Sequence, residues 1–345
     1  MAFDLRRDRE LFLPMTSILA AMSVGLLIVI GLLPAEVLAA DAAPTAEAQS
    51  QDNKGVQSEE KPPEGVLGRI ESRFYGATPE EQTRLEEERK RLSAAAAVFG
   101  TDPTAINGYY QLEYGHNTLL HNLRTDSATA EARLPITPNF VMRVTMPYVW
   151  ADLNQPRGFT TNGASDLLVR FGGRVYASPE LAVFVGGDAT FPTGSNDQLS
   201  TGKYTLGPGG AVAVPLPRLR SLFFSFVQDY NSVGGDPSRA NLHFMRVTSA
   251  FNTIWSERWW TTASMEWDMN WNNNRKTTMN LLGEVGHRLD QHWNVFASYG
   301  AGVMGRDSFL GLDWTVQLGV RWVFMTPFFS ERVLEQFPKP GPPSH

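Results

Sequence analysis

The chain has 345 residues, no cysteine and a formal net charge of −6. Without cysteine it has no disulfide and no thiolate metal site, and without a strongly basic region we expect no nucleic-acid partner. A mean hydropathy of −0.23 excludes a bundle of transmembrane helices. Nine Trp and 30 Gly in such a chain are typical of a β-rich envelope protein.

The first 39 residues have the pattern of a signal peptide. Arg6, Arg7 and Arg9 precede an uncharged apolar run, 16–33, and Pro34 and a small-residue site at Ala39 follow it. We predict cleavage here, so that the mature chain is exported. An uncleaved membrane anchor is the alternative, because the apolar run is longer than most signal sequences require.

The next two segments are predicted to lie in the periplasm. Residues 40–77 are rich in Ala, Glu, Gln, Ser and Pro, which predicts a disordered linker. Residues 78–100 predict a helix, because Thr78 can cap it, Pro79 suits its first position, Glu81 completes a capping box and Gly100 can end it. We expect a solvated charged helix; the alternative is a helix that docks against or plugs a barrel.

From residue 106 onward the periodicity changes from helical to alternating. In 314–324 one face of an extended strand is apolar and aromatic while the other is polar, as on a lipid-facing barrel strand. The segment 221–231 alternates large apolar residues with Ser and Asp, and the two faces of 241–253 are mixed, so its orientation is not assigned. The twelve segments are 106–115, 127–134, 140–150, 165–176, 181–191, 205–216, 221–231, 241–253, 259–271, 277–288, 293–303 and 314–324.

The connections between these segments alternate between long and short. The short ones are predicted at 135–139, 177–180, 215–219, 254–258 and 288–292. Short periplasmic turns, longer external loops and an even strand count are features of outer-membrane barrels. We therefore predict an all-β fold, a twelve-stranded antiparallel transmembrane β-barrel over 106–324 with a short N-terminal helical segment. A Pro-rich tail, 325–345, follows in the sequence.

Charged residues collect on the face that is predicted to point inward. Facing lipid, an arginine would cost about 2–4 kcal/mol near the membrane midplane, so these positions indicate a polar lumen. Mixed charges could pair and fill that lumen, or an acidic wall (Glu266, Asp268, Glu284) could face a basic wall (Arg170, Arg174) across a narrow pore. The predicted lumen-lining residues are Arg170, Arg174, Asp188, Glu266, Asp268, Glu284 and Arg321.

Bulky aromatic residues fall at the ends of the predicted strands. Aromatic belts at both membrane interfaces occupy such positions. The predicted interface residues are Trp150, Trp259, Trp271, Trp293, Trp314 and Phe324.

Motifs for catalysis or metal binding are not found in the sequence. There is no Gly-x-Ser-x-Gly elbow and no His-Glu-x-x-His zinc pattern. His116, His121, His287 and His292 flank turns, where surface histidines are more common than metal ligands. We predict no enzymatic activity, no catalytic residue, no metal and no cofactor.

Two short motifs resemble a known family. Residues 191–195 read Phe-Pro-Thr-Gly-Ser, residues 204–210 read Tyr-Thr-Leu-Gly-Pro-Gly-Gly, and Asp188 precedes both. They are similar to the Pro-Thr-Gly loop and the Gly-rich strand of the outer-membrane transporter family named for the meta-pathway of phenol degradation. Over about 110–325 the resemblance implies a twelve-stranded barrel that takes up small, often apolar or aromatic compounds, without catalytic residues. The segment 41–105 and the chain beyond Phe324 depart from that family.

These observations predict an outer-membrane barrel of a Gram-negative bacterium that lets small solutes pass, as a porin-like channel or transporter. Its partners would be outer-membrane lipid, a small-molecule solute and, during biogenesis, the barrel-assembly machinery. The alternative is a structural or adhesive barrel with a filled lumen, whose function lies in its external loops.

Overall fold

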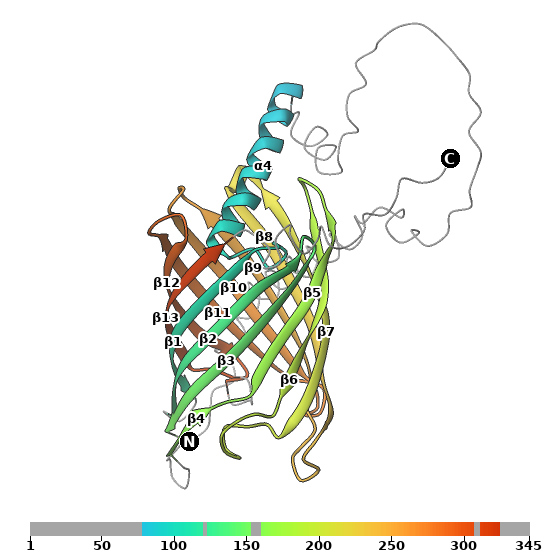
Figure 1. Cartoon of the computed structure of the whole chain (residues 1–345), viewed down its shortest axis with the longest axis vertical. Coiled ribbons are helices and arrows are strands. Elements are labelled where there is room, and N and C mark those ends of the chain that lie inside the picture. Colours follow the sequence, from blue (N-terminus) through green and yellow to red (C-terminus); the bar gives the residue numbers. More distant parts are fainter. Residues whose placement is uncertain (1–77, 120–122, 153–159, 307–310, 325–345) are drawn as a thin grey trace, which may run out of the picture. The chain divides into compact units, whose positions relative to one another are not determined.

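A computed structural model describes residues 78–119, 123–152, 160–306 and 311–324. The predicted signal peptide, linker and Pro-rich tail lie outside these residues. Within them, one helix, α4, precedes a single antiparallel sheet (Figure 1). Among the described residues there is no helix that is long and apolar enough to cross a membrane.

The sheet closes on itself to form a barrel. Each strand pairs with its neighbour in sequence, and β1 pairs with β13. The short β4 and the longer β5 both pair with β3, so they are two parts of one barrel strand, and the thirteen segments make twelve barrel strands. Their bounds are β1 Gly108–Leu119, β2 Leu123–Thr137, β3 Phe140–Asp152, β4 Thr160–Ala164, β5 Leu167–Ala177, β6 Ala182–Phe191, β7 Lys203–Leu216, β8 Ser221–Gly235, β9 His243–Ile254, β10 Trp259–Asn270, β11 Lys276–Arg288, β12 Trp293–Met304 and β13 Trp314–Phe324.

The two ends of the barrel differ in their connections. At one end, the short-turn end, the strands are joined by tight turns, including the 3-10 turn η2 (Pro217–Leu219) between β7 and β8. The other is the long-loop end. One predicted long connection is wrong: we expected a loop over 116–126, but β1 extends to Leu119 and β2 begins at Leu123. Polar cross-strand pairs such as His116 and Asp126 continue the ladder there, and sequence alternation does not register them.

For most strands, the faces that point outward and inward in the structure are those predicted from the alternating sequence. The outward face of β13 carries Leu318, which is 55% exposed, whereas Arg321 on the other face is buried. Strand β8 is different, since its apolar face points into the barrel: Leu222, Phe226 and Tyr230 are buried there. The general rule that the apolar face meets lipid fails for β8 because these side chains contact other groups inside the barrel.

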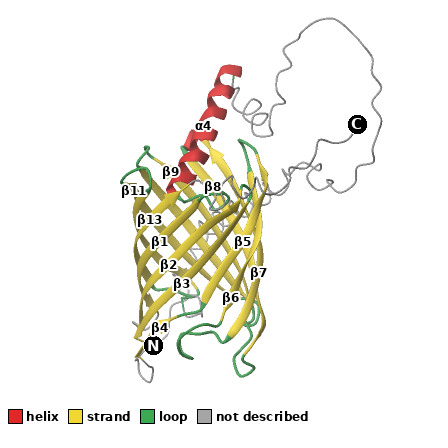
Figure 2. Ribbon diagram, in the orientation of Figure 1, coloured by secondary structure: helices red, strands yellow, loops and turns green. Residues whose placement is uncertain are grey.

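Helix α4 spans Pro79–Phe99. Thr78 caps it by accepting a hydrogen bond from the Glu81 amide, and Gly100 ends it with a left-handed φ of 72°, which favours glycine. The Glu81 side chain does not complete the capping box, because it pairs with Arg218 on the η2 turn at 3.0 Å. The helix lies at the short-turn end of the barrel (Figure 2).

Candidate functional site

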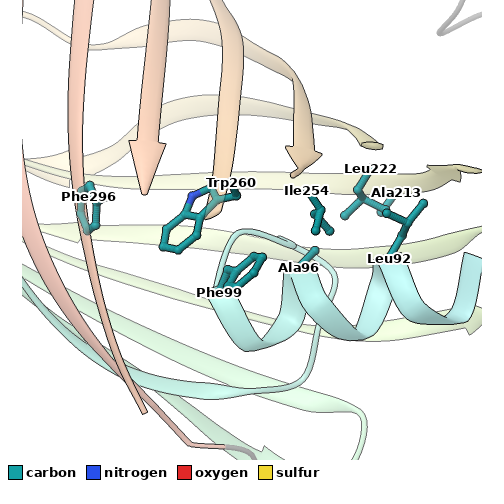
Figure 3. Close-up of a cluster of buried hydrophobic side chains, with 8 residues drawn as sticks. All are labelled: Leu92, Ala96, Phe99, Ala213, Leu222, Ile254, Trp260 and Phe296. Carbon is teal, nitrogen blue, oxygen red and sulfur yellow. The ribbon is translucent and has the colours of Figure 1, made fainter. Parts of the chain in front are cut away.

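The C-terminal half of α4 packs against the inner wall of the barrel. Leu92, Ala96 and Phe99 are buried against side chains from five strands (Figure 3). The Phe99 ring stacks on the indole of Trp260, with ring centroids 4.6 Å apart and planes inclined by 18°. The wall residues of this cluster are Ala213, Leu222, Ile254, Trp260 and Phe296.

Glycines on neighbouring strands make room for the two large aromatic rings of this cluster. A Cβ at Gly286 would lie 1.9 Å from the Trp260 ring, and one at Gly319 would lie 2.1 Å from the Phe296 ring. The Trp260 indole nitrogen also donates a hydrogen bond to Glu284 at 2.9 Å, which fixes the orientation of the ring. The wall thus presents a fixed aromatic surface to the helix.

Side chains outside the helix also satisfy the carbonyl groups at its end. Asn294 donates to the Val98 carbonyl at 3.2 Å, and Arg321 donates to the Phe99 carbonyl at 2.7 Å. The amide of Asn107 donates to the Ala97 carbonyl at 2.6 Å. The last carbonyls of a helix lack partners within it and carry partial negative charge, so a buried arginine there is favourable.

The segment that follows the helix contacts other strands of the inner wall. The Arg133 guanidinium donates to the backbone carbonyls of Asp102, Pro103 and Ala105. Ile106 packs against a second apolar cluster, whose members are Val141, Phe184, Ala211 and Phe226. We call residues 89–107 the plug.

Inward side chains that the plug buries come from most of the barrel circumference. They include Arg133 on β2, Val141 on β3, Phe184 on β6, Ala211 on β7, Leu222 on β8, Ile254 on β9, Trp260 on β10, Asn294 on β12 and Arg321 on β13. The charged middle of the helix is solvent-exposed as expected, for example at Glu86 and Lys90, whereas its C-terminal turns dock against the barrel as in the alternative.

Beyond the plug, toward the long-loop end, the inner wall carries paired charges. Arg170 donates to both carboxylate oxygens of Asp188, at 2.6 and 2.8 Å, and to Gln228 at 2.9 Å. Tyr230 donates to the same carboxylate at 2.7 Å. The Asp188 side chain is 0% exposed, whereas that of Arg170 is 22% exposed.

The Gly-rich strand and the Pro-Thr-Gly loop lie next to this group. Gly207 pairs with Asp188 across β6 and β7, and a Cβ there would lie 2.9 Å from the Tyr230 ring. The amide of Gly194 in the loop donates to Asp166 at 3.1 Å, which ties the loop to the start of β5. The two motifs thus make space for and border the Arg170 group.

A second charged group lies on β9 and β10. Arg246 donates to both oxygens of Asp268, at 2.7 and 3.1 Å, and lies 3.3 Å from Glu266. Sequence alternation missed Arg246 because the faces of its strand are mixed. Its register opposite Asp268 and Gln228 gives its orientation.

The predicted lumen residues therefore fall into distinct groups rather than one ring. Arg321 and Glu284 belong to the wall that holds the plug. Arg174 lies on the inward face of β5, where its charge acts on the buried Asp102 of the plug. Asp188 and Arg170, and likewise Asp268 and Glu266, pair with near neighbours along the wall.

The predicted interface aromatics divide between the two ends of the barrel. At the long-loop end are Trp150, Trp271 and Trp314; at the short-turn end are Trp259, Trp293 and Phe324. Trp150, Trp259, Trp271 and Trp293 are each at least 37% exposed. An aromatic girdle at each end is what a membrane-spanning barrel requires.

No family model matches the chain, and no curated protein matches its sequence. The structure resembles an outer membrane channel from Pseudomonas putida F1, with a TM-score of 0.51 and 12% identity over 63% of this chain and 95% of that chain. It also resembles the NanC porin, with a TM-score of 0.46 and 10% identity over 62% of this chain and 98% of that one. At such identities the first similarity shows a shared fold, so this chain folds as an outer-membrane β-barrel.

Proposed function

We propose that this protein is an outer-membrane channel for small solutes whose periplasmic mouth is closed by its own N-terminal plug. The proposal rests on the contrast between the closed short-turn end of the barrel and the more accessible interior beyond it. The plug buries inward side chains around most of the circumference at the short-turn end. Farther in, Arg170 and Arg246 keep 22% and 28% of their side chains exposed, so space for water remains beside them.

The residues at the contact between the plug and the barrel support a plug that can be released rather than one that fills the barrel permanently. Arg89 is buried 3.9 Å from Glu180, and Asp102, Thr104 and Asn107 of the plug are buried as well. Buried ion pairs contribute less stability than well-packed apolar groups of the same size, because charges regain hydration when they separate. An interface with this many polar groups is suited to release.

The solute is small because a twelve-stranded barrel lies between those filled by side chains and those with wide aqueous channels. The resemblance to the phenol meta-pathway family supports apolar or aromatic compounds as one solute class.

Planar-bilayer conductance tests the proposal with the full chain. Phe99→Ala removes the ring that stacks on Trp260, so we expect more frequent or longer openings than in the wild type. Tyr299→Ala, which removes an outward ring that is 59% exposed, is the matched control and should leave conductance unchanged. Because the chain has no cysteine, E81C/R218C joined by a short bismaleimide would hold the plug in place and suppress openings.

The second candidate is a structural barrel whose charges pair and fill the interior. The bidentate pairs of Arg170 and Arg246 favour it. Absence of conductance at every voltage in both the wild type and the Phe99→Ala variant would support this candidate and exclude the channel.

A further inference from the structure

The inner wall places three arginines side by side. Arg133 is the cross-strand partner of Arg143, and Arg143 is the cross-strand partner of Arg170, on β2, β3 and β5. Like charges directly opposite each other on one face of a sheet are destabilising. Three in a row therefore need compensating groups, and each arginine has a different one.

The three arginine side chains differ in how exposed their compensating groups leave them. Arg133 is buried because the carbonyls of the plug accept its hydrogen bonds. Arg143 lies 3.5 Å from Glu131, and the side chains are 23% and 11% exposed; Arg170 and Asp188 are 22% and 0% exposed. In both pairs the arginine side chain is more exposed than the carboxylate side chain. In addition, Arg143 Nε is buried without a hydrogen-bond partner among the described residues.

The opposite side of the barrel has a similar pair but adds an exposed carboxylate. Arg246 and its partner Asp268 are 28% and 2% exposed, but Glu266, 3.3 Å from Arg246, is 27% exposed, so this side offers the lumen no excess of positive charge. In the closed order of twelve strands, β10 is six steps from β3 in either direction. The side that carries Arg143 and Arg170 is therefore the cationic side of the lumen.

We propose that Arg143 and Arg170 form a binding site for the oxyanion group, carboxylate or phosphate, of a small solute in the lumen. Two adjacent guanidinium groups present planar N–H donors that match oxyanion geometry. Although Glu131 lies beside Arg143, and Asp188 and Gln228 accept hydrogen bonds from Arg170, the two arginine side chains stay 23% and 22% exposed, which leaves part of each accessible to a ligand. The site lies on the lumen side of the plug, so a solute would reach it from the long-loop end. This inference rests on the proposed channel, since it names a class of solute.

Equilibrium binding to the refolded full chain tests the site without relying on conductance. Isothermal titration calorimetry in detergent with sodium succinate and with inorganic phosphate should give saturable binding of at least one probe. Arg143→Gln should weaken that binding at least tenfold, and Arg143→Lys, which keeps the charge but loses the fork, should weaken it less. Far-ultraviolet circular dichroism checks that each variant has folded.

The matched control removes an arginine outside the proposed site. Arg306→Gln, at the pair with Asp313 at the long-loop end, should leave the affinity within about twofold of the wild type. Binding of succinate alone would assign the site to carboxylates, and binding of phosphate alone would assign it to phosphates. Absence of saturable binding to the folded wild type, or equal binding by Arg143→Gln, would overturn the site. Binding in a protein that never conducts would leave the site standing and refute the channel.

Discussion

The short-turn half of the barrel and the middle of its lumen solve the same packing problem with different groups. At the short-turn end, apolar rings and backbone carbonyls of the plug fill the space, and the wall residues that contact them are buried. In the middle, the wall satisfies its own charges through neighbouring strands, and the arginines stay partly exposed. The first half depends on another segment of the chain, whereas the second half is self-sufficient.

The comparison teaches which interactions belong to the barrel and which to the gate. Removing a group from the self-sufficient half should weaken the barrel itself. Removing a group from the plugged half should release the plug and leave the strands paired.

The largest effect is expected for Asp188→Ala. It leaves Arg170 without its bidentate partner and Tyr230 without its acceptor, and removing one member of a buried ion pair costs about 3–5 kcal/mol. Denaturant unfolding of the refolded barrel in detergent should show this loss. Because Asp188 accepts its hydrogen bonds from Arg170 and Tyr230 on the wall, hydrogen exchange of α4 should stay as in the wild type; faster exchange of the helix alone would contradict the division.

Trp260→Ala should have the opposite effect and change the hydrogen exchange of α4 more than that of the barrel strand β10. The indole is 0% exposed, and it stacks on Phe99 and donates to Glu284. Removing a buried Trp costs about 3–5 kcal/mol, but here part of that cost falls on the docked plug. Hydrogen–deuterium exchange should therefore accelerate over Pro79–Phe99 more than over β10. The Phe99→Ala variant, which removes the other ring, should reproduce the helix effect without affecting β10.

Arg321→Gln should release the end of the helix with a smaller effect. The guanidinium donates to the Phe99 carbonyl at 2.7 Å and to Gln111 at 2.7 Å. Charged hydrogen bonds contribute about 1.5–3 kcal/mol. We expect faster exchange of the last turn of α4 and longer channel openings. Arg306→Gln, at an exposed pair with Asp313 at the long-loop end, is the matched control and should change neither readout.

The sequence predicted the barrel well because the membrane imposes a period of two on every strand. Strand β13 has the predicted bounds, and Thr78 and Gly100 cap the predicted helix. The docking of the C-terminal turns of the helix could not be predicted with the same certainty, because their apolar surface is small and their main partner, Trp260, lies on the otherwise polar face of its strand. Arg246 was not found because its strand mixes both faces, and its register, which comes from the neighbouring strands, is needed to orient it.

Docking of the plug should also depend on pH through Asp102. Burial raises the pKa of this carboxyl, while hydrogen bonds from Thr104 and the charges of Arg133 and Arg174 oppose the rise. A group whose pKa is higher when docked favours docking below its ordinary pKa, near 4, and loses that contribution as pH rises through the raised value. Helix protection should thus decrease from acidic to neutral pH. Asp102→Asn should remove that part of the dependence.

The smallest effect is expected where the helix meets the rim of the barrel. Glu81 and Arg218 pair at 3.0 Å, but their side chains are 43% and 44% exposed, and exposed pairs contribute less than about 1 kcal/mol. Glu81→Ala should therefore leave exchange of the last turn of α4 unchanged and increase it only in the first turn. If this variant released the whole plug, the exposed rim rather than the buried ring of Trp260 would hold the gate. The division between a self-sufficient wall and a plug held at its buried end would then be wrong, because the helix would be fixed from outside the barrel.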